Sequence, residues 1–212
     1  EVTAVTTSTN DTSPDYTFSS SEAGTITYGG SCSSSTTSAT TDNNTITLVS
    51  LSEGTYSDCT ITVTDTASNS VTLNISSFVI DTTAPTVSSI SPTDNQSGYT
   101  RRGDISVTFS ESIDNSSVTI NTSNTSCSGT LQVSSDNFNT CVQMSSAPAV
   151  SNSNKTFTIT PLSMLSVSTL YKISVTTGVK DITGNNITSQ WIQTNGFVTS
   201  SWNGTQQLGT SS

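Results

Sequence analysis

The feature that most constrains the fold is a repeated alternation of apolar side chains with threonine or serine over short segments. In one of these segments, Ile105, Val107 and Phe109 alternate with Ser106 and Thr108. Successive side chains of a strand point to opposite faces of a sheet, so this period of two predicts strands with one buried face. Threonine is β-branched and suits the exposed face of a pleated sheet. No long segment has a helical period, and we therefore expect an all-β protein.

The same alternation predicts strands along both halves of the chain. In the first half the expected strands cover residues 26–28, 46–48, 59–63 and 71–75. A shift of parity before Phe78 and Ile80 predicts a β-bulge. In the second half the expected strands cover residues 105–109, 118–120, 131–133, 142–144, 157–159 and 171–175, and a short helical turn is expected within 161–169.

The length of 212 residues fits two domains, because all-β sandwiches contain about 100 residues each. Residues 81–87, which include Pro85, are the expected boundary, since proline cannot continue a hydrogen-bonded ladder. We expect two antiparallel β-sandwiches in tandem, at residues 1–83 and 84–199. Residues 200–212 have no core pattern beyond Trp202 and Leu208 and read as a tail or linker.

The four cysteines lie two in each half of the chain and allow three pairings. The simplest pairing is Cys32 with Cys59 and Cys127 with Cys141, because each bond then closes a loop inside its own domain. A zinc site is not expected, since the chain has no histidine and no C-x-x-C spacing. Disulfides indicate an oxidising compartment outside the cytosol.

The charge of the chain excludes several classes of partner. The formal net charge is −10, which disfavours nucleic acids and anionic membrane surfaces. No apolar run approaches the roughly twenty residues of a membrane helix.

The sequence has no catalytic signature. Histidine, the commonest general base, is absent, and no serine has the signature of an activated nucleophile. The sequence therefore predicts a protein that is not an enzyme and does not insert into a membrane.

Two similar segments place a tyrosine before an Asp-x-x-x-Asn turn. Tyr56 is followed by the turn 65–69, and Tyr171 by the turn 181–185. A tyrosine at this place in a sandwich predicts a tyrosine corner, in which the hydroxyl bonds back to the backbone a few residues upstream.

The aspartates and asparagines of these turns have two interpretations. Calcium prefers hard oxygen ligands from loops, and the turns together with the boundary aspartate could supply them at a domain junction. The same residue types also satisfy turn backbones without any metal. Calcium is the one cofactor that we consider, with the ligand set Asp65, Asn69, Asp81, Asp181 and Asn185, and with Asp94, Asp104 and Asp114 as further candidates.

Residues 86–199 resemble the SbsA-type bacterial Ig-like domain. The resemblance rests on residues 85–87, 91–95, 105–111, 157–161, 171–175 and 179–185. Residues 2–83 resemble another bacterial Ig-like repeat, through residues 14–18, 22–26, 54–56 and 81–85, although Ser68 stands where that turn usually has glycine. The tail is similar to the opening of a bacterial surface β-propeller repeat. The resemblance implies an extracellular bacterial surface protein whose domains act as stalks, layers or adhesive arrays, and it implies no substrate.

Two functions remain open at this stage. One is a non-catalytic, semi-rigid stalk or layer element that packs against neighbouring Ig-like domains. The other is a subunit of an extracellular filament, in which copies of the chain join by adding a strand to an open sheet edge. The expected strand donor is the segment Val2, Thr3, Ala4 and Val5.

Carbohydrate enters in two ways. Trp191 and Phe197 could together form an aromatic platform for cell-surface glycans. Attached sugar is expected at the Asn-x-Ser/Thr sequons if the host has the transferase. These sequons begin at Asn10, Asn43, Asn74, Asn95, Asn115, Asn121, Asn124, Asn154, Asn186 and Asn203.

Overall fold

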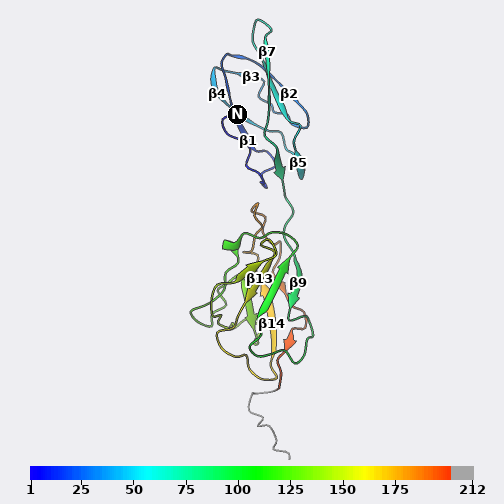
Figure 1. Ribbon diagram of the computed structural model, residues 1–212, viewed down its shortest axis with the longest axis vertical. Coiled ribbons are helices and arrows are strands. Elements are labelled where there is room, and N and C mark those ends of the chain that lie inside the picture. The colour runs from blue at the N-terminus through cyan, green and yellow to red at the C-terminus, as the bar shows by residue number, and fades with distance from the viewer. Residues whose placement is uncertain (202–212) are drawn as a thin grey trace, which may run out of the picture. The chain divides into compact units, whose positions relative to one another are not determined.

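A computed structural model describes residues 1–201, and these residues form two compact β units. Unit 1 comprises Glu1–Thr83, and unit 2 begins at Ala84 (Figure 1). The only helical element in the described part of the chain is a single 3-10 turn, η1 (Asn115–Ser117). No helix among these residues has the length and apolar character needed to cross a membrane. The predicted tail residues Trp202, Asn203 and Leu208 lie outside the described residues.

Unit 1 consists of one antiparallel four-stranded sheet and two two-stranded ribbons. The sheet has the order β3-β2-β6-β7 and contains β2 (Gly24–Gly29), β3 (Ser38–Ala39), β6 (Thr60–Thr64) and β7 (Ser70–Asn74). One ribbon pairs β1 (Asp15–Ser20) with β4 (Asp42–Thr47), and the other pairs β5 (Gly54–Tyr56) with β8 (Phe78–Ile80).

The core of unit 1 follows the alternation of the sequence. On β1, Tyr16 and Phe18 point inward and are almost fully buried, whereas Thr17 points outward and its hydroxyl lies 2.9 Å from that of Thr45 on β4. Ile61 of β6 faces the same core. Burying each large apolar side chain contributes roughly 1.5–3 kcal/mol, so a few such strands can hold the unit together despite its polar surface.

The parity shift near Phe78 has a different cause from the expected bulge. The backbone N–H of Ile75 still bonds to the carbonyl of Cys59 at the end of the four-stranded sheet. Phe78 and Ile80 belong instead to β8, which pairs with β5 in a separate ribbon. The chain therefore changes sheets at Ser76 and Ser77, and both parities bury their apolar residues in one core.

Unit 2 is a sandwich of two sheets. The first has the order β12-β13-β10-β9 and contains β9 (Val87–Ser91), β10 (Ile105–Phe109), β12 (Ala149–Ser151) and β13 (Thr156–Ile159). In the second, β14 (Leu170–Val175) pairs with β11 (Leu131–Ser134), β15 (Trp191–Ile192) and β16 (Phe197–Val198). All pairs within the two sheets are antiparallel.

The core of unit 2 is rich in aromatic contacts. Phe109 of β10 meets Phe157 of β13 edge to face at 5.8 Å between ring centroids. Phe197 of β16 is fully buried, stacks on Tyr171 and meets Tyr99 in an edge-to-face contact. Such pairs contribute about 0.5–1.5 kcal/mol beyond the burial of their area. The first pair ties together neighbouring strands of one sheet, and the stacked pair does the same in the other.

Three expected elements of the second half take another form. Val118 follows directly after η1 as its C-cap instead of lying in a strand. Met144 makes only an isolated bridge to Pro161, and residues 162–169 form turns without a helix. Val118, Met144 and Leu165 are nevertheless buried, so the apolar residues of these segments reach the core without regular secondary structure.

Each unit is closed by its own disulfide. Cys32 bonds to Cys59 in unit 1, and Cys127 bonds to Cys141 in unit 2, with Cα atoms 5.2 and 5.0 Å apart. No free cysteine is present among the described residues. The bonds observed are the pairing that the sequence favoured, one in each half.

Candidate functional site

The expected strand donor is the piece of backbone that joins the two ribbons of unit 1. The N–H groups of Val2 and Thr3 donate to the carbonyl of Thr17, and the N–H of Thr17 donates to the carbonyl of Thr3. Farther along, Thr9 forms a parallel bridge to Ile80 of β8. Residues 3–9 thus contact β1 at one end and β8 at the other.

The same segment contributes side chains to the unit. Val5 is only 5% exposed and belongs to the core. The Glu1 carboxylate accepts hydrogen bonds from the N–H and hydroxyl of Ser76 and from the hydroxyl of Tyr16. The bond from the Ser76 hydroxyl lowers the pKa of Glu1, so this carboxylate is ionised at neutral pH. In this structure, the predicted donor therefore completes its own unit.

The Asp181 turn is organised by one buried carboxylate. Asp181 is 1% exposed, and its Oδ1 accepts from the backbone N–H groups of Thr183, Gly184 and Asn185 at 2.6–2.8 Å. Its Oδ2 accepts from the Asn185 side-chain amide at 2.8 Å. The carboxylate thus satisfies the donors of its own turn, which is the metal-free interpretation of this pattern.

The Asp65 turn repeats this arrangement on the surface of unit 1. Asp65 accepts from the N–H groups of Ala67 and Asn69 and from the Asn69 amide, all at 2.8 Å. The bonds from Asn69 lower the pKa of Asp65. Asp81 accepts from the N–H of Thr83 near the end of the unit. Calcium binding by the predicted residues stays a prediction, which a calcium titration of the native protein would check.

One carboxylate clamp was not found from the sequence. Asp94 accepts from the N–H groups of Asn195 and Gly196 and from the Asn195 side-chain amide, across 101 and 102 positions of the chain. Burial raises the pKa of Asp94, but these hydrogen bonds together outweigh burial and hold the pKa below its usual value. The local Asp-x-x-x-Asn spacing could not indicate this pair, because the partner lies in a distant loop.

Both expected tyrosine corners are present. The Tyr56 hydroxyl donates to the carbonyl of Ser52 at 2.9 Å, and the Tyr171 hydroxyl accepts from the N–H of Ser166 at 3.1 Å. The partners lie four and five residues upstream. These hydroxyls therefore hold the connection into a strand, and they are structural groups instead of reactive ones.

Two carbohydrate expectations need correction. Asn121 is 3% exposed and its Nδ2 donates to the carbonyl of Asn124, so this sequon is not accessible in the folded unit. Phe197 is fully buried in the core, so it cannot form an exposed platform with Trp191. The other sequon asparagines within the described residues are exposed, and glycosylation there stays a prediction: Asn10, Asn43, Asn74, Asn95, Asn115, Asn124, Asn154 and Asn186.

The comparison with known protein families agrees with the architecture of unit 2. Residues 81–199 match the bacterial Ig-like domain family. Two solved structures are similar at 20% identity and a TM-score of 0.38 over 56% of the chain: the N-terminal part of the bacterial S-layer protein SbsC, and the S-layer protein rSbsC(31-844). The matched part spans 24% and 14% of the length of these two structures, and similarity at this level carries no argument about function. No curated protein matches the chain. Because the family match covers more than half of the 212 residues, the chain belongs to the bacterial Ig-like domain family.

Proposed function

We propose that this chain is a non-catalytic structural module of an extracellular bacterial surface protein, in which sandwich units in series bear load or pack with their neighbours. The observation that carries the proposal is that each unit has its own apolar core and its own disulfide. Two independently cored units resist extension separately, and each disulfide limits how far its unit can extend. The membership of residues 81–199 in a bacterial Ig-like family supports the same function.

Single-molecule pulling of the full chain tests this function. We expect two unfolding events, one per unit. With the disulfides intact, the segments closed by the bonds cannot extend, and these span sequence separations of 27 residues in unit 1 and 14 in unit 2. Reduction should lengthen the two steps by these amounts. A chain that extends without resistance, or in a single step, would contradict the proposal.

The disulfides support the proposed extracellular location, because such bonds form and persist in oxidising compartments. Thiol labelling of the protein in intact cells should find no reactive cysteine, and a membrane-impermeant protease should reach it. Labelling at any of the four cysteines in native material would place the protein in a reducing compartment instead.

A second function, assembly into a filament by strand exchange, is favoured by the N-terminal segment. Residues 1–9 are held in unit 1 by a few backbone bonds, by the hydrogen bonds of the Glu1 carboxylate and by one buried apolar side chain, Val5. If two copies exchange this segment, every one of these contacts forms again between chains, which is how domain swapping builds assemblies at low cost.

Negative-stain microscopy distinguishes filaments from single particles. Wild-type protein should form fibres if the strand is exchanged, and a variant lacking residues 1–8 should not. A sharper variant is T3C/T17C, because these residues exchange both backbone bonds and so lie at a separation that a disulfide can span. Locking the segment in its own unit should abolish fibres without unfolding the unit, whereas T3S/T17S should leave them unchanged. Wild-type protein that stays monomeric at every concentration would rule out exchange.

A further inference from the structure

Part of the inward face of β7 is left uncovered in unit 1. Val71 pairs in register with Val63, and Leu73 pairs with Ile61, so these four side chains share one face. The opposite face has the hydroxyls, with Thr62 and Thr72 at 2.7 Å from each other. Ile61 is buried as an inward side chain should be, yet Val71 is 74% exposed. The apolar face therefore continues beyond the part that the rest of the unit covers.

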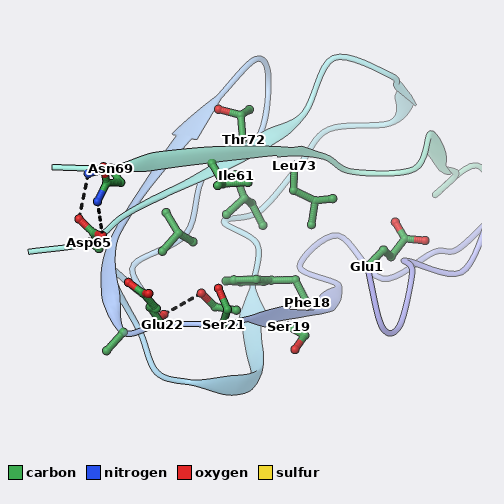
Figure 2. Close-up of a pocket in the computed structure, with 14 residues that line it drawn as sticks. Glu1, Phe18, Ser19, Ser21, Glu22, Ile61, Asp65, Asn69, Thr72 and Leu73 are labelled. Carbon is green, nitrogen blue, oxygen red and sulfur yellow. Dashed lines mark hydrogen bonds between the residues drawn. The ribbon is translucent and has the colours of Figure 1, made fainter. Parts of the chain in front are cut away.

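A cavity of about 410 Å³ lies over this face. Phe18, Ile61, Val63 and Leu73 supply its apolar lining. Figure 2 shows Phe18 across the space from Ile61 and Leu73. This volume is in the range of peptide and ligand sites, which combine an apolar floor with a few polar groups. We name this cavity the β1–β7 slot.

Within residues 1–201, each side of the slot has backbone N–H and carbonyl groups without a backbone partner. β7 is the end strand of its sheet. Because Asn69 and Ile75 bond toward the preceding strand, the even-numbered residues, such as Thr72, turn their N–H and carbonyl groups outward. On β1, Thr17 bonds to Thr3, whereas Ser19, which points the same way, has no such partner among residues 1–201. An extended strand added here would pair with β1 and cover Val71.

The charged residues that line the slot all have the same sign. They are Glu1, Glu22 and Asp65, and residues 1–83 contain nine carboxylates but no lysine, arginine or histidine. The carboxylates of Glu1 and Asp65 also accept hydrogen bonds that favour their ionised form. An occupant with acidic side chains would be repelled, whereas one with lysine or arginine would gain attraction at both ends of the slot.

We propose that the β1–β7 slot binds an extended strand of a partner protein in which apolar side chains alternate with polar ones that include lysine or arginine. The apolar side chains lie over Val71 and Leu73, the backbone pairs with the free edge of β1 at Ser19, and the cationic side chains approach Glu22 and Asp65. This interaction differs from the exchange of residues 1–9, because that segment bridges to Thr17 and only its residue Glu1 lines the slot.

Peptide binding to the full chain tests the proposal. The probe is a fluorescent peptide of about six residues, the usual strand length, that alternates valine with threonine and lysine. One control peptide replaces lysine by glutamate, and another has the same composition in an order without alternation. Fluorescence anisotropy should show binding of the lysine probe alone, and this binding should weaken as salt screens the carboxylates.

Substitutions in the chain locate the site. V71K places a cation in the slot and should weaken binding at least about tenfold. V150K is the matched control, because Val150 is an exposed valine on the end strand β12 of unit 2. E22Q should weaken binding and reduce its salt dependence, whereas E53Q, outside the slot, should do neither. Val71 and Glu22 are exposed, so circular dichroism should show both variants folded.

Three results would overturn the proposal. The first is that the glutamate or reordered peptide binds as well as the lysine probe. The second is that V71K and V150K have equal effects. The third is that wild-type protein self-associates and V71K makes it monomeric, since the slot would then hold a second copy of the chain.

Discussion

In each unit the hydroxyl of one tyrosine makes the hydrogen bond of the tyrosine corner, as a donor in unit 1 and as an acceptor in unit 2. The Tyr56 hydroxyl donates to a carbonyl, whereas the Tyr171 hydroxyl accepts from the N–H of Ser166. The bond to Tyr171 is partly buried, whereas the bond made by Tyr56 is exposed, so Y171F leaves the Ser166 N–H without its partner in the less accessible of the two places. We expect Y56F to cost about 1 kcal/mol and Y171F about 2 kcal/mol of unfolding free energy. Denaturant unfolding checks this order, and it is wrong if Y171F is the milder change.

The two Asp-x-x-x-Asn turns form a matched pair that differs in burial. D181A leaves the N–H groups of Thr183, Gly184 and Asn185 without their acceptor, and that carboxylate is almost fully buried. We expect a loss of about 2–4 kcal/mol in unit 2. D65A exposes its turn donors to water and should cost unit 1 clearly less. Equal losses of unfolding free energy in D181A and D65A would show that burial does not determine how much these turn carboxylates stabilise their units.

The raised pKa of Tyr16 predicts that unit 1 loses stability at alkaline pH. Burial raises its pKa to about 12, and the charge of Glu1 adds to the shift. The folded state thus keeps the proton that the unfolded state releases near the ordinary tyrosine pKa of 10.0. This contribution is complete below about pH 10 and is lost as the pH rises toward about 12, so unit 1 should become easier to unfold over that range. Y16F should lessen the dependence, and an unchanged slope would contradict the assignment.

Among the elements, strands with one buried and one hydroxyl face were predictable, and irregular segments were not. The alternation at Ile105, Val107 and Phe109 predicts both that these residues form a strand and which face of it is buried. At Val118 and Met144 the same apolar spacing only marks residues that reach the core, because burial does not require a ladder. At Ser76 and Ser77 the parity shift was visible in the sequence. A change of sheet and a β-bulge produce the same shift, so the sequence could not distinguish them.

The candidate sites were less predictable than the strands, for a related reason. Val71 reads as a core residue, since its pattern is that of an inward strand position. Its 74% exposure depends on where the opposing layer ends, which no local pattern encodes. The pairing of Asp94 with Asn195 is likewise a product of the tertiary fold. In contrast, the Asp65 and Asp181 turns are local, and their spacing was sufficient to find them.

The disulfides should act on their own units alone. In the chain-entropy picture, the loop closed by Cys32 and Cys59 is worth about 3.5 kcal/mol and the loop closed by Cys127 and Cys141 about 3 kcal/mol. Replacing one pair by serine should therefore destabilise one unit and leave the other unchanged. Both tryptophans follow residue 84, so tryptophan fluorescence reports unit 2 while circular dichroism reports both units. Loss of both transitions from one double substitution would show that the units fold together.

At the scale of the whole molecule, the charges are divided unevenly. Residues 1–83 contain nine acidic side chains and no basic one, whereas residues 84–212 contain six acidic and all five basic ones. Unit 1 therefore has a formal side-chain charge of −9 and unit 2 of −1, which together give the net charge of −10. Like charges on one small unit repel one another and oppose its compact state.

This division predicts that salt affects the two units differently. Raising the ionic strength shortens the Debye length and screens the repulsion in unit 1. The unfolding free energy of unit 1 should then increase by about 1 kcal/mol or less, and its melting temperature should rise accordingly. Unit 2 has cations near its carboxylates, including Lys180 at 3.5 Å from Asp114, and should change little. Calorimetry of the full chain at low and high ionic strength resolves the comparison. A decrease for unit 1 would mean that its carboxylates are held by attractive contacts that salt weakens, and the nine charges would then stabilise the unit instead of straining it.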